Sequence, residues 1–125
     1  MNKATEHAEQ SAVIHWALLM ENYQPALKNL FAIPNAGKRS IGVAMYYKKE
    51  GLKSGVPDLM LPFPSREFHG LFIEMKSDTG RPTENQKEWI SRLRDAGYQC
   101  DVCRSADEAI RLISDYLGME AKNAY

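Results

Sequence analysis

The chain has 125 residues, 44% of them hydrophobic and 26% charged, which is typical of one globular domain whose core needs neither disulfides nor a structural metal. Sixteen basic residues balance sixteen acidic ones, which argues against a generally basic nucleic-acid coat. No apolar stretch approaches the length of a membrane span, and residues 1–6 lack the apolar core of a signal peptide, so we expect a cytoplasmic protein.

The first predicted element is a helix over about 5–21, where apolar residues recur at spacings of three and four and Thr5 can serve as the N-cap. Glu6 and Glu9 both fall within about 40° of Val13 around this helix, so each lies on or beside its inward stripe. An acid in a first helical turn commonly interacts only with the helix dipole. Their inward placement makes both acids candidates for a functional site.

A short strand at 30–33 comes next and is stopped by the turn sequence 34–37. This turn would bring backbone amides and the Asn35 side chain close to a ligand, and Lys38 and Arg39 follow at once. Amides together with bases suit contact with phosphate. A plain connecting loop is the alternative, and it needs no ligand.

A second helix is predicted over about 40–50, ending at Gly51. Its apolar side chains, Ile41, Ala44, Met45 and Tyr47, are expected to face inward. Between residues 38 and 53 there are five bases against one acid, which indicates a local anion-binding surface, although a solvated helix face would also carry charge. The candidate DNA-binding residues are Asn35, Lys38, Arg39, Lys48, Lys49 and Lys53.

Two apolar strands with charged ends follow, at 58–61 and 70–76, close enough in sequence to pair as a hairpin. Asp58 begins the first, and alternation along the second puts Glu74 and Lys76 on the same face. Burying such charges costs several kcal/mol unless they are paired or bind a metal. A structural ion pair between Glu74 and Lys76, with Asp58 as a turn residue, is the alternative that these strands leave open.

The loop at 77–82 has the composition of a mobile segment. Thr83 and Gln86 then form the pattern of a capping box, which opens a helix that stops at Gly97. We therefore expect Gln86 in the first turn of this helix.

The last two predicted elements are a strand at 98–103 and an amphipathic helix over about 105–117. Cys100 and Cys103 lie in the strand, but zinc needs four ligands and a redox motif normally opens a helix, so a pair of free thiols is expected. Residues 118–125 are expected to form a flexible tail.

The order of elements is α, β, α, β, β, α, β, α, which predicts an α/β fold in a single domain, 1–125. Its small mixed β-sheet would be flanked by helices on both faces. The sequence shows no Walker loop, Rossmann fingerprint or nucleophile elbow, so no organic cofactor is expected.

If a first-helix acid converges with Asp58 and Glu74, two or three carboxylates and the backbone carbonyl of Met75 would form an oxygen-rich site for Mg²⁺ or Mn²⁺. Such an ion activates water and neutralises charge on a scissile phosphate. Lys76 would orient the water or stabilise the transition state. These residue types fit the hydrolysis of phosphodiester bonds.

Pro57-Asp58 followed by Glu74-Met75-Lys76 resembles the catalytic signature of the PD-(D/E)XK nuclease superfamily. Together with further residues across about 5–115, it resembles the VRR-NUC family within that superfamily. The wider resemblance rests on Glu6 and Gln10 on the first helix, Ile33-Pro34-Asn35, Gly51, Gly55-Val56-Pro57-Asp58-Leu59, Ile73-Glu74-Met75-Lys76, and Gln86.

The resemblance implies a restriction-endonuclease-like core and cleavage of DNA that depends on Mg²⁺ or Mn²⁺, with Asp58 and Glu74 as metal ligands and Lys76 catalytic. It also implies an acid on the first helix. The family's spacing of an acid four residues before a glutamine indicates Glu6, and Glu9 is the alternative. Gln86 corresponds to a helix glutamine that contacts the site, although capping alone would explain it.

Stand-alone members of this size are similar to viral or bacterial nucleases that cut branched DNA, and in design to Holliday junction resolvases. The resemblance therefore implies four-way junctions or other branched DNA as substrate, a homodimer, and the cytoplasm of a bacterial host if the chain is phage-encoded. Symmetric cutting of a four-way junction requires two sites.

Two other functions remain open at this point. One is a non-catalytic DNA-binding module on the same fold, which the intact Asp58, Glu74 and Lys76 disfavour. The other is a nuclease acting on RNA or on single-stranded ends, because phosphate chemistry is shared and the sequence shows no aromatic stacking stripe and no evident reader of the 2′-hydroxyl.

Overall fold

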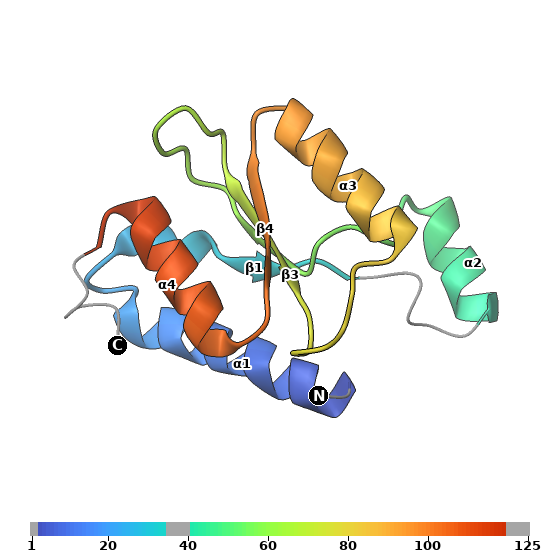
Figure 1. Cartoon of the computed structure of the whole chain (residues 1–125), viewed down its shortest axis with the longest axis horizontal. Helices are drawn as coiled ribbons and strands as arrows, with labels where there is room; N and C mark the ends of the chain where they lie inside the picture. The colour runs from blue at the N-terminus through green and yellow to red at the C-terminus, as the bar shows by residue number, and fades with distance from the viewer. Residues whose placement is uncertain (1–2, 35–40, 120–125) are drawn as a thin grey trace.

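The computed structural model describes residues 3–34 and 41–119 of the chain (Figure 1). Its elements follow the predicted order of helices and strands, with a short 3₁₀ helix, η1, added before the first strand. Their bounds are α1 Lys3–Met20, η1 Pro25–Asn29, β1 Phe31–Ala32, α2 Ile41–Lys49, β2 Leu59–Leu61, β3 Leu71–Met75, α3 Glu84–Asp95, β4 Gln99–Cys103 and α4 Ala106–Leu117.

The four strands form one mixed sheet in the order β1-β2-β3-β4. β1 with β2 and β2 with β3 are antiparallel, so the predicted hairpin is confirmed, and β4 runs parallel to β3. In the register, Leu59 lies opposite Ile73, and Glu74 lies opposite Val102. The predicted fold class, a mixed sheet flanked by helices, is confirmed.

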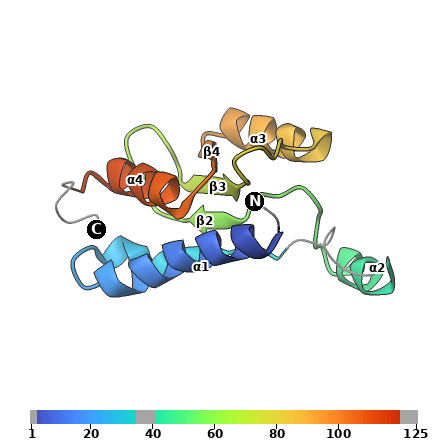
Figure 2. The same ribbon diagram turned by 60° about the horizontal axis from the view of Figure 1, so that its bottom comes forward.

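Helices cover both faces of the sheet. The main core lies between one face and the pair α1 and α4, with Val13, Ile73 and Ile113 among its buried residues. A smaller core lies on the other face, where Ile90 of α3 packs with Phe72 and Cys100. Figures 1 and 2 show α1 and α3 on opposite sides of the strands. Side chains that alternate along β3 therefore reach two different cores.

Local signals placed most helix ends correctly. Thr83 and Gln86 form the predicted capping box, and Gly51 and Gly97 have φ values of +102° and +98° where their helices end. The prediction for Thr5 was wrong, because α1 begins at Lys3 and Thr5 lies inside it. The helix extends further toward the N-terminus than the cap pattern indicated.

The prediction that Met45 faces inward was also wrong, since its side chain is 57% exposed. The reason is that α2 stands away from the sheet, as both ribbon views show, so it has no core to face (Figures 1 and 2). Tyr47 is half-buried. The side chains of Ile41 and Ala44, and residues 35–37 of the expected turn, lie outside the described part of the chain, as do residues 120–125 of the expected tail.

Cys100 and Cys103 are both free thiols, as predicted. They belong to the smaller and the main core respectively, on opposite faces of β4, so they cannot share a metal. Burial raises the pKa of each thiol to about 12. Among the described residues, no helix combines the length and apolar character needed to cross a membrane.

Candidate active site

Asp58 and Glu74 meet where β2 begins and β3 ends. Leu59 pairs with Ile73, and continuing this antiparallel register by one residue brings Asp58 opposite Glu74. Both side chains are buried, with 6% and 2% of their surface exposed. Asp58 Oδ2 accepts a hydrogen bond of 2.7 Å from the backbone amide of Met75. Two buried carboxylates on neighbouring strands are thus held at one end of the sheet.

The turn before β2 fixes the position of Asp58. Gly55 has a φ of +87°, and a Cβ atom there would lie 2.9 Å from the Asn85 side chain, so glycine is required. Asn85 Nδ2 donates to the carbonyl of Ser54 at 2.9 Å, which ties this turn to α3. On the other side, Ile33 N donates to the carbonyl of Asp58 at 2.8 Å. Asp58 is therefore anchored by β1, β3 and α3 together.

Lys76 follows β3 on the same face as Glu74 and is half-buried. Its backbone amide donates to the carbonyl of Cys103 at 2.9 Å. Its ammonium forms no ion pair with any carboxylate in the part of the chain that the structure describes. The structural Glu74–Lys76 ion pair, the alternative left open by the sequence, is therefore not formed.

The structure separates the two acids of α1. Glu6 Oε1 accepts a hydrogen bond of 3.1 Å from the amide of Ser77, the residue after Lys76. Glu9 Oε2 accepts one of 2.7 Å from the amide of Ala106, the first residue of α4. Glu6 thus lies against the main chain that leaves β3, whereas Glu9 satisfies the start of another helix.

Sequence reasoning missed the part played by Arg104. Its Nη1 atom donates to the carbonyls of Ser77 and Gly80 at 2.7 and 2.6 Å, and Ser77 Oγ accepts from the Gly80 amide at 2.8 Å. The segment after Lys76, which has the composition of a mobile loop, is therefore held by Arg104 and Glu6. Nothing in the spacing of Arg104 indicates contacts more than twenty residues away.

Gln86 is buried in the first turn of α3. Its side-chain Oε1 accepts a hydrogen bond from the backbone amide of Thr83 at 2.9 Å. Its backbone amide donates to Thr83 Oγ1 at 3.1 Å, so the capping explanation is confirmed. This cap uses the side-chain oxygen. The side-chain nitrogen, a donor, has no protein partner in residues 3–34 and 41–119.

The donor set fits a hard divalent cation. Asp58, Glu74 and the Met75 carbonyl offer only oxygen, and Mg²⁺ is commonly held by one or two carboxylates while it keeps several waters. No three His, Cys, Asp or Glu side chains within the described residues are grouped closely enough to hold a metal ion. Glu6 and Glu9 therefore do not complete a three-carboxylate cluster within the described residues, and the candidate site is the pair Asp58 and Glu74.

The predicted DNA-binding residues fall into two groups. Lys48 and Lys49 are exposed at the end of α2, and Lys53 is exposed in the segment that leads to β2. Asn35, Lys38 and Arg39 lie outside the residues that the structure describes.

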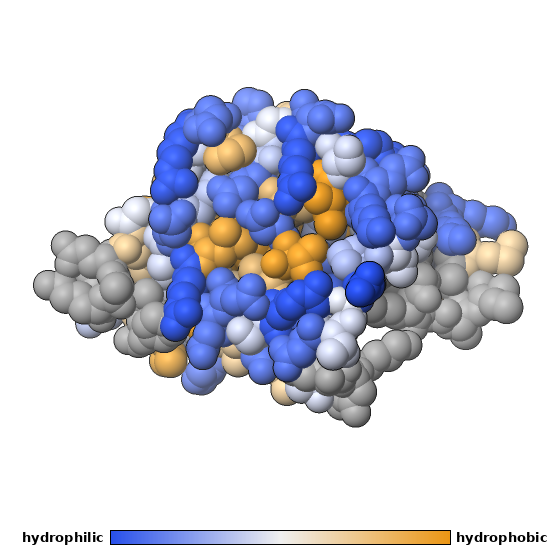
Figure 3. Space-filling view, in the orientation of Figure 1, coloured by the Kyte–Doolittle hydropathy of each residue, from blue (hydrophilic) through white to orange (hydrophobic). Residues whose placement is uncertain are grey.

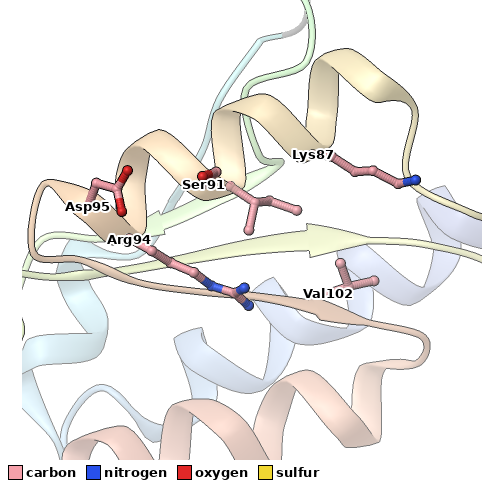
Figure 4. A pocket seen from close by; sticks show the side chains of 6 residues that line it. Lys87, Ser91, Arg94, Asp95 and Val102 are labelled. Carbon is pink, nitrogen blue, oxygen red and sulfur yellow. The ribbon is translucent and has the colours of Figure 1, made fainter.

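A separate hollow of about 360 Å³ lies between α3 and β4, with Ile90 and Val102 in its lining. In Figure 3 apolar side chains gather over β4, between α3 and α4, with hydrophilic ones around them. Figure 4 shows Arg94 reaching from α3 toward β4, and Lys87 at the other end of the helix. Lys87 pairs with Glu84 at 3.3 Å, and Arg94 Nε donates to the carbonyl of Cys100 at 2.9 Å while its Nη2 pairs with Asp101 at 3.2 Å. The bases of this hollow already serve internal contacts.

Comparison with known proteins agrees with this geometry. The model of the VRR-NUC domain family matches residues 2–107. The Fanconi-associated nuclease 1 homolog of Schizosaccharomyces pombe is 32% identical over 104 residues, which are 82% of this chain but only 14% of that protein. A solved structure described as a VRR_NUC domain protein superposes with a TM-score of 0.77 at 27% identity, covering 95% of this chain and 93% of the other.

Proposed function

The chain belongs to the VRR-NUC nuclease family, whose fold is that of the PD-(D/E)XK nucleases, and we propose that it is an endonuclease that hydrolyses DNA with Mg²⁺ or Mn²⁺. One observation carries the proposal. Buried Asp58 and Glu74 stand opposite each other on neighbouring strands, with the ammonium of Lys76 on the same face as Glu74 and outside any ion pair with the described carboxylates. A fold gains little stability from such an arrangement, whereas phosphodiester hydrolysis needs it.

Asp58, Glu74 and the Met75 carbonyl would hold the cation. When bound, a divalent cation lowers the pKa of a coordinated water and neutralises charge on the scissile phosphate. The Met75 amide donates to Asp58 Oδ2 and so holds the orientation of this carboxylate. Lys76 donates hydrogen bonds to the attacking water or to the phosphate oxygens that gain charge.

Glu6 is proposed as a positioning residue rather than as a direct metal ligand, because it holds the amide of Ser77 and so fixes the main chain directly after Lys76. Gln86 is proposed to donate its side-chain NH₂ to the substrate or to a water in the site, since the cap leaves that group available. Lys48, Lys49 and Lys53, with Asn35, Lys38 and Arg39, are proposed to contact DNA phosphates.

We further propose that the substrate is branched DNA such as a four-way junction, and that the chain acts as a homodimer in the cytoplasm, which is that of a bacterial host if the chain is phage-encoded. The relative in Schizosaccharomyces pombe is named a Fanconi-associated nuclease, and the chain spans about one seventh of its length. The described residues form one such site, and symmetric incision requires two.

The test is cleavage of labelled four-way junctions, flaps, duplexes and single strands of DNA, and of matched RNA, with Mg²⁺ and with Mn²⁺. We expect incision of branched DNA that is lost on chelation and restored by either ion. Equal cutting of every DNA would remove the preference for branches and keep the nuclease.

Asp58→Asn keeps the size of the side chain and should abolish that incision while circular dichroism and the melting temperature show an intact fold. Full activity of this variant would overturn the proposed site. Salt-sensitive DNA binding without Mg²⁺ binding or cleavage in the native protein would instead indicate a non-catalytic module.

A further inference from the structure

Two neighbouring hollows lie on the side of α3 that faces α2 and the segment leading to β2. One, of about 350 Å³, has a mainly apolar lining that includes Ile33, Val56 and Trp89. The other, of about 380 Å³, is lined by Lys48, Arg92 and again Trp89, among others. Because the two share Leu52, Lys53 and Trp89, the indole ring stands between an apolar hollow and a basic one.

The ring of Trp89 is in contact with a neighbouring arginine. Arg92 places its guanidinium 4.3 Å from the ring centroid, a cation–π contact one turn further along α3. Asn85, Trp89 and Arg92 are spaced by four and three residues, so they share one face of the helix. Asn85 is bound to Ser54 at the base of this face. The aromatic surface is therefore prepared before any ligand arrives.

The basic hollow favours an anion. Its lining contains Lys48, Lys53 and Arg92 and no acid. Within the described parts of the chain, neither lysine forms an ion pair. Besides its contact with Trp89, Arg92 forms one ion pair among the described residues, with Glu88 at 3.9 Å and at an exposed position, which is worth little.

The apolar hollow adjoins the candidate active site through the backbone. Ile33 lines the hollow, and its amide donates to the carbonyl of Asp58 at 2.8 Å. Val56 lines it as well and precedes Asp58 by two residues. A group bound against Trp89 would therefore lie beside the strand start that presents the first carboxylate.

We propose that an unpaired nucleobase of the DNA substrate stacks on Trp89 in the apolar hollow, while the phosphates next to it contact Lys48 and Lys53. Aromatic rings stack on any base without reading its sequence, and the flanking lysines match the charged backbone. This inference rests on the proposed nuclease function and adds a specificity determinant, which is an unpaired nucleotide beside the cut in a branched substrate.

The test compares a flap whose unpaired nucleotide at the junction is intact with one that carries an abasic residue there. Native protein should cut the abasic flap about tenfold less efficiently, and Trp89→Leu should lose a similar factor on the intact flap. The abasic residue and Trp89→Leu remove the same contact, so their effects should not add, and the Trp89→Leu variant should cut both flaps equally. The Trp89→Phe variant keeps an aromatic face and should again cut the intact flap faster than the abasic one.

Ser91 lies on the β4 side of α3, so Ser91→Ala serves as the matched control. This variant should cut both flaps at the rates of the native protein. Stacking can also be measured without cleavage, in the Glu74→Gln variant, by placing a fluorescent adenine analogue at the unpaired position of the flap. Binding to Glu74→Gln should quench the analogue, and binding to the double variant Glu74→Gln/Trp89→Leu should not. The inference is overturned if the native protein cuts both flaps equally, or if Trp89→Leu still distinguishes them. Absence of cleavage by the native protein with Mg²⁺ and Mn²⁺ would overturn the proposed nuclease instead, and the fluorescence would still report on stacking.

Discussion

The end of β3 and the junction between β4 and α4 lie side by side and use their charged residues in different ways. At the junction, each charge serves the fold: Glu9 accepts from the Ala106 amide, Glu108 accepts from the Arg104 amide at 3.0 Å, and Arg104 binds two carbonyls. At the end of β3, the half-buried Lys76 forms no ion pair with a described carboxylate. The charges at the start of α4 are explained by the stability of the fold. Those at the end of β3 are not, and a bound ligand would explain them.

α1 joins the two regions, because Glu6 and Glu9 are one helical turn apart and reach one region each. Both acids are half-buried, and both accept a backbone amide. Burial and hydrogen bonding alone therefore do not identify a functional acid. The location of the amide that it binds does: Ser77 follows Lys76, whereas Ala106 begins α4. The variants that follow separate the two regions, from the largest expected effect to the smallest.

Lys76→Met should give the largest effect. We expect cleavage to fall by about a hundredfold to a thousandfold, since a donor to the transition state is lost. Stability should not fall, because the ammonium makes no described ion pair and methionine retains the apolar stem. Single-turnover rates and urea unfolding measure the two quantities. A marked loss of stability without loss of cleavage would place Lys76 with the structural charges.

Glu6→Ala should have an intermediate effect, lowering cleavage by about tenfold, the scale on which a misplaced catalytic group loses rate. Alanine removes the oxygen that accepts from the Ser77 amide. Glu6→Gln keeps such an oxygen and should therefore restore most of the native rate. The loss should lie in kcat with KM for the flap unchanged. If Glu6→Ala cuts as the native protein does, Glu6 serves the fold alone.

Glu9→Ala is the matched control and should cut within about twofold of the native rate, because the partner of Glu9 is the start of α4. It removes the acceptor and should lower the free energy of unfolding by about 1 kcal/mol, the usual cost of a lost helix cap. Thermal and urea unfolding check this value. A larger loss of cleavage for Glu9→Ala than for Glu6→Ala would exchange the roles assigned to the two acids.

The effect that is smallest at neutral pH comes from the two buried thiols and appears only in alkaline solution. Burial raises the pKa of Cys100 and Cys103 to about 12 in the folded chain, above the ordinary value of 9.0. Above pH 9 the unfolded chain therefore loses these protons first, so stability should be full below pH 9 and fall steadily toward pH 12. Cys103→Ser and Cys100→Ser should each flatten this fall. At pH 8 both thiols should resist a disulfide reagent until the chain is unfolded, and fast reaction in the native state would contradict this.

Sequence patterns predicted the features that depend on neighbours along the chain. The capping box at Thr83, the glycines that end α2 and α3, and the alternation that puts Glu74 and Lys76 on one face are all local. Two predictions were wrong, Thr5 as an N-cap and Met45 as an inward-facing residue. Where a helix starts and which of its faces is buried also depend on what packs against it. η1 was missed because its five residues show no periodicity.

Features that depend on contacts between residues far apart in the sequence could not be predicted from local patterns. The choice between Glu6 and Glu9 rests on contacts that span 71 and 97 residues, and the part of Arg104 rests on contacts that span 24 or more. The sequence showed no aromatic stripe, because the hollows beside Trp89 combine one ring with β1, α2 and the segment before β2. Spacing along α3 alone could not reveal them.

The bond from Arg94 to the carbonyl of Cys100 bears on how copies of this chain can associate. It uses an acceptor of β4, which lies at one edge of the sheet, and the strand at the other edge, β1, has only two residues. Neither edge is a good template for adding a strand from a second molecule. A homodimer should therefore form through helices and loops rather than through a sheet shared between subunits, and the edges should also resist growth into fibres.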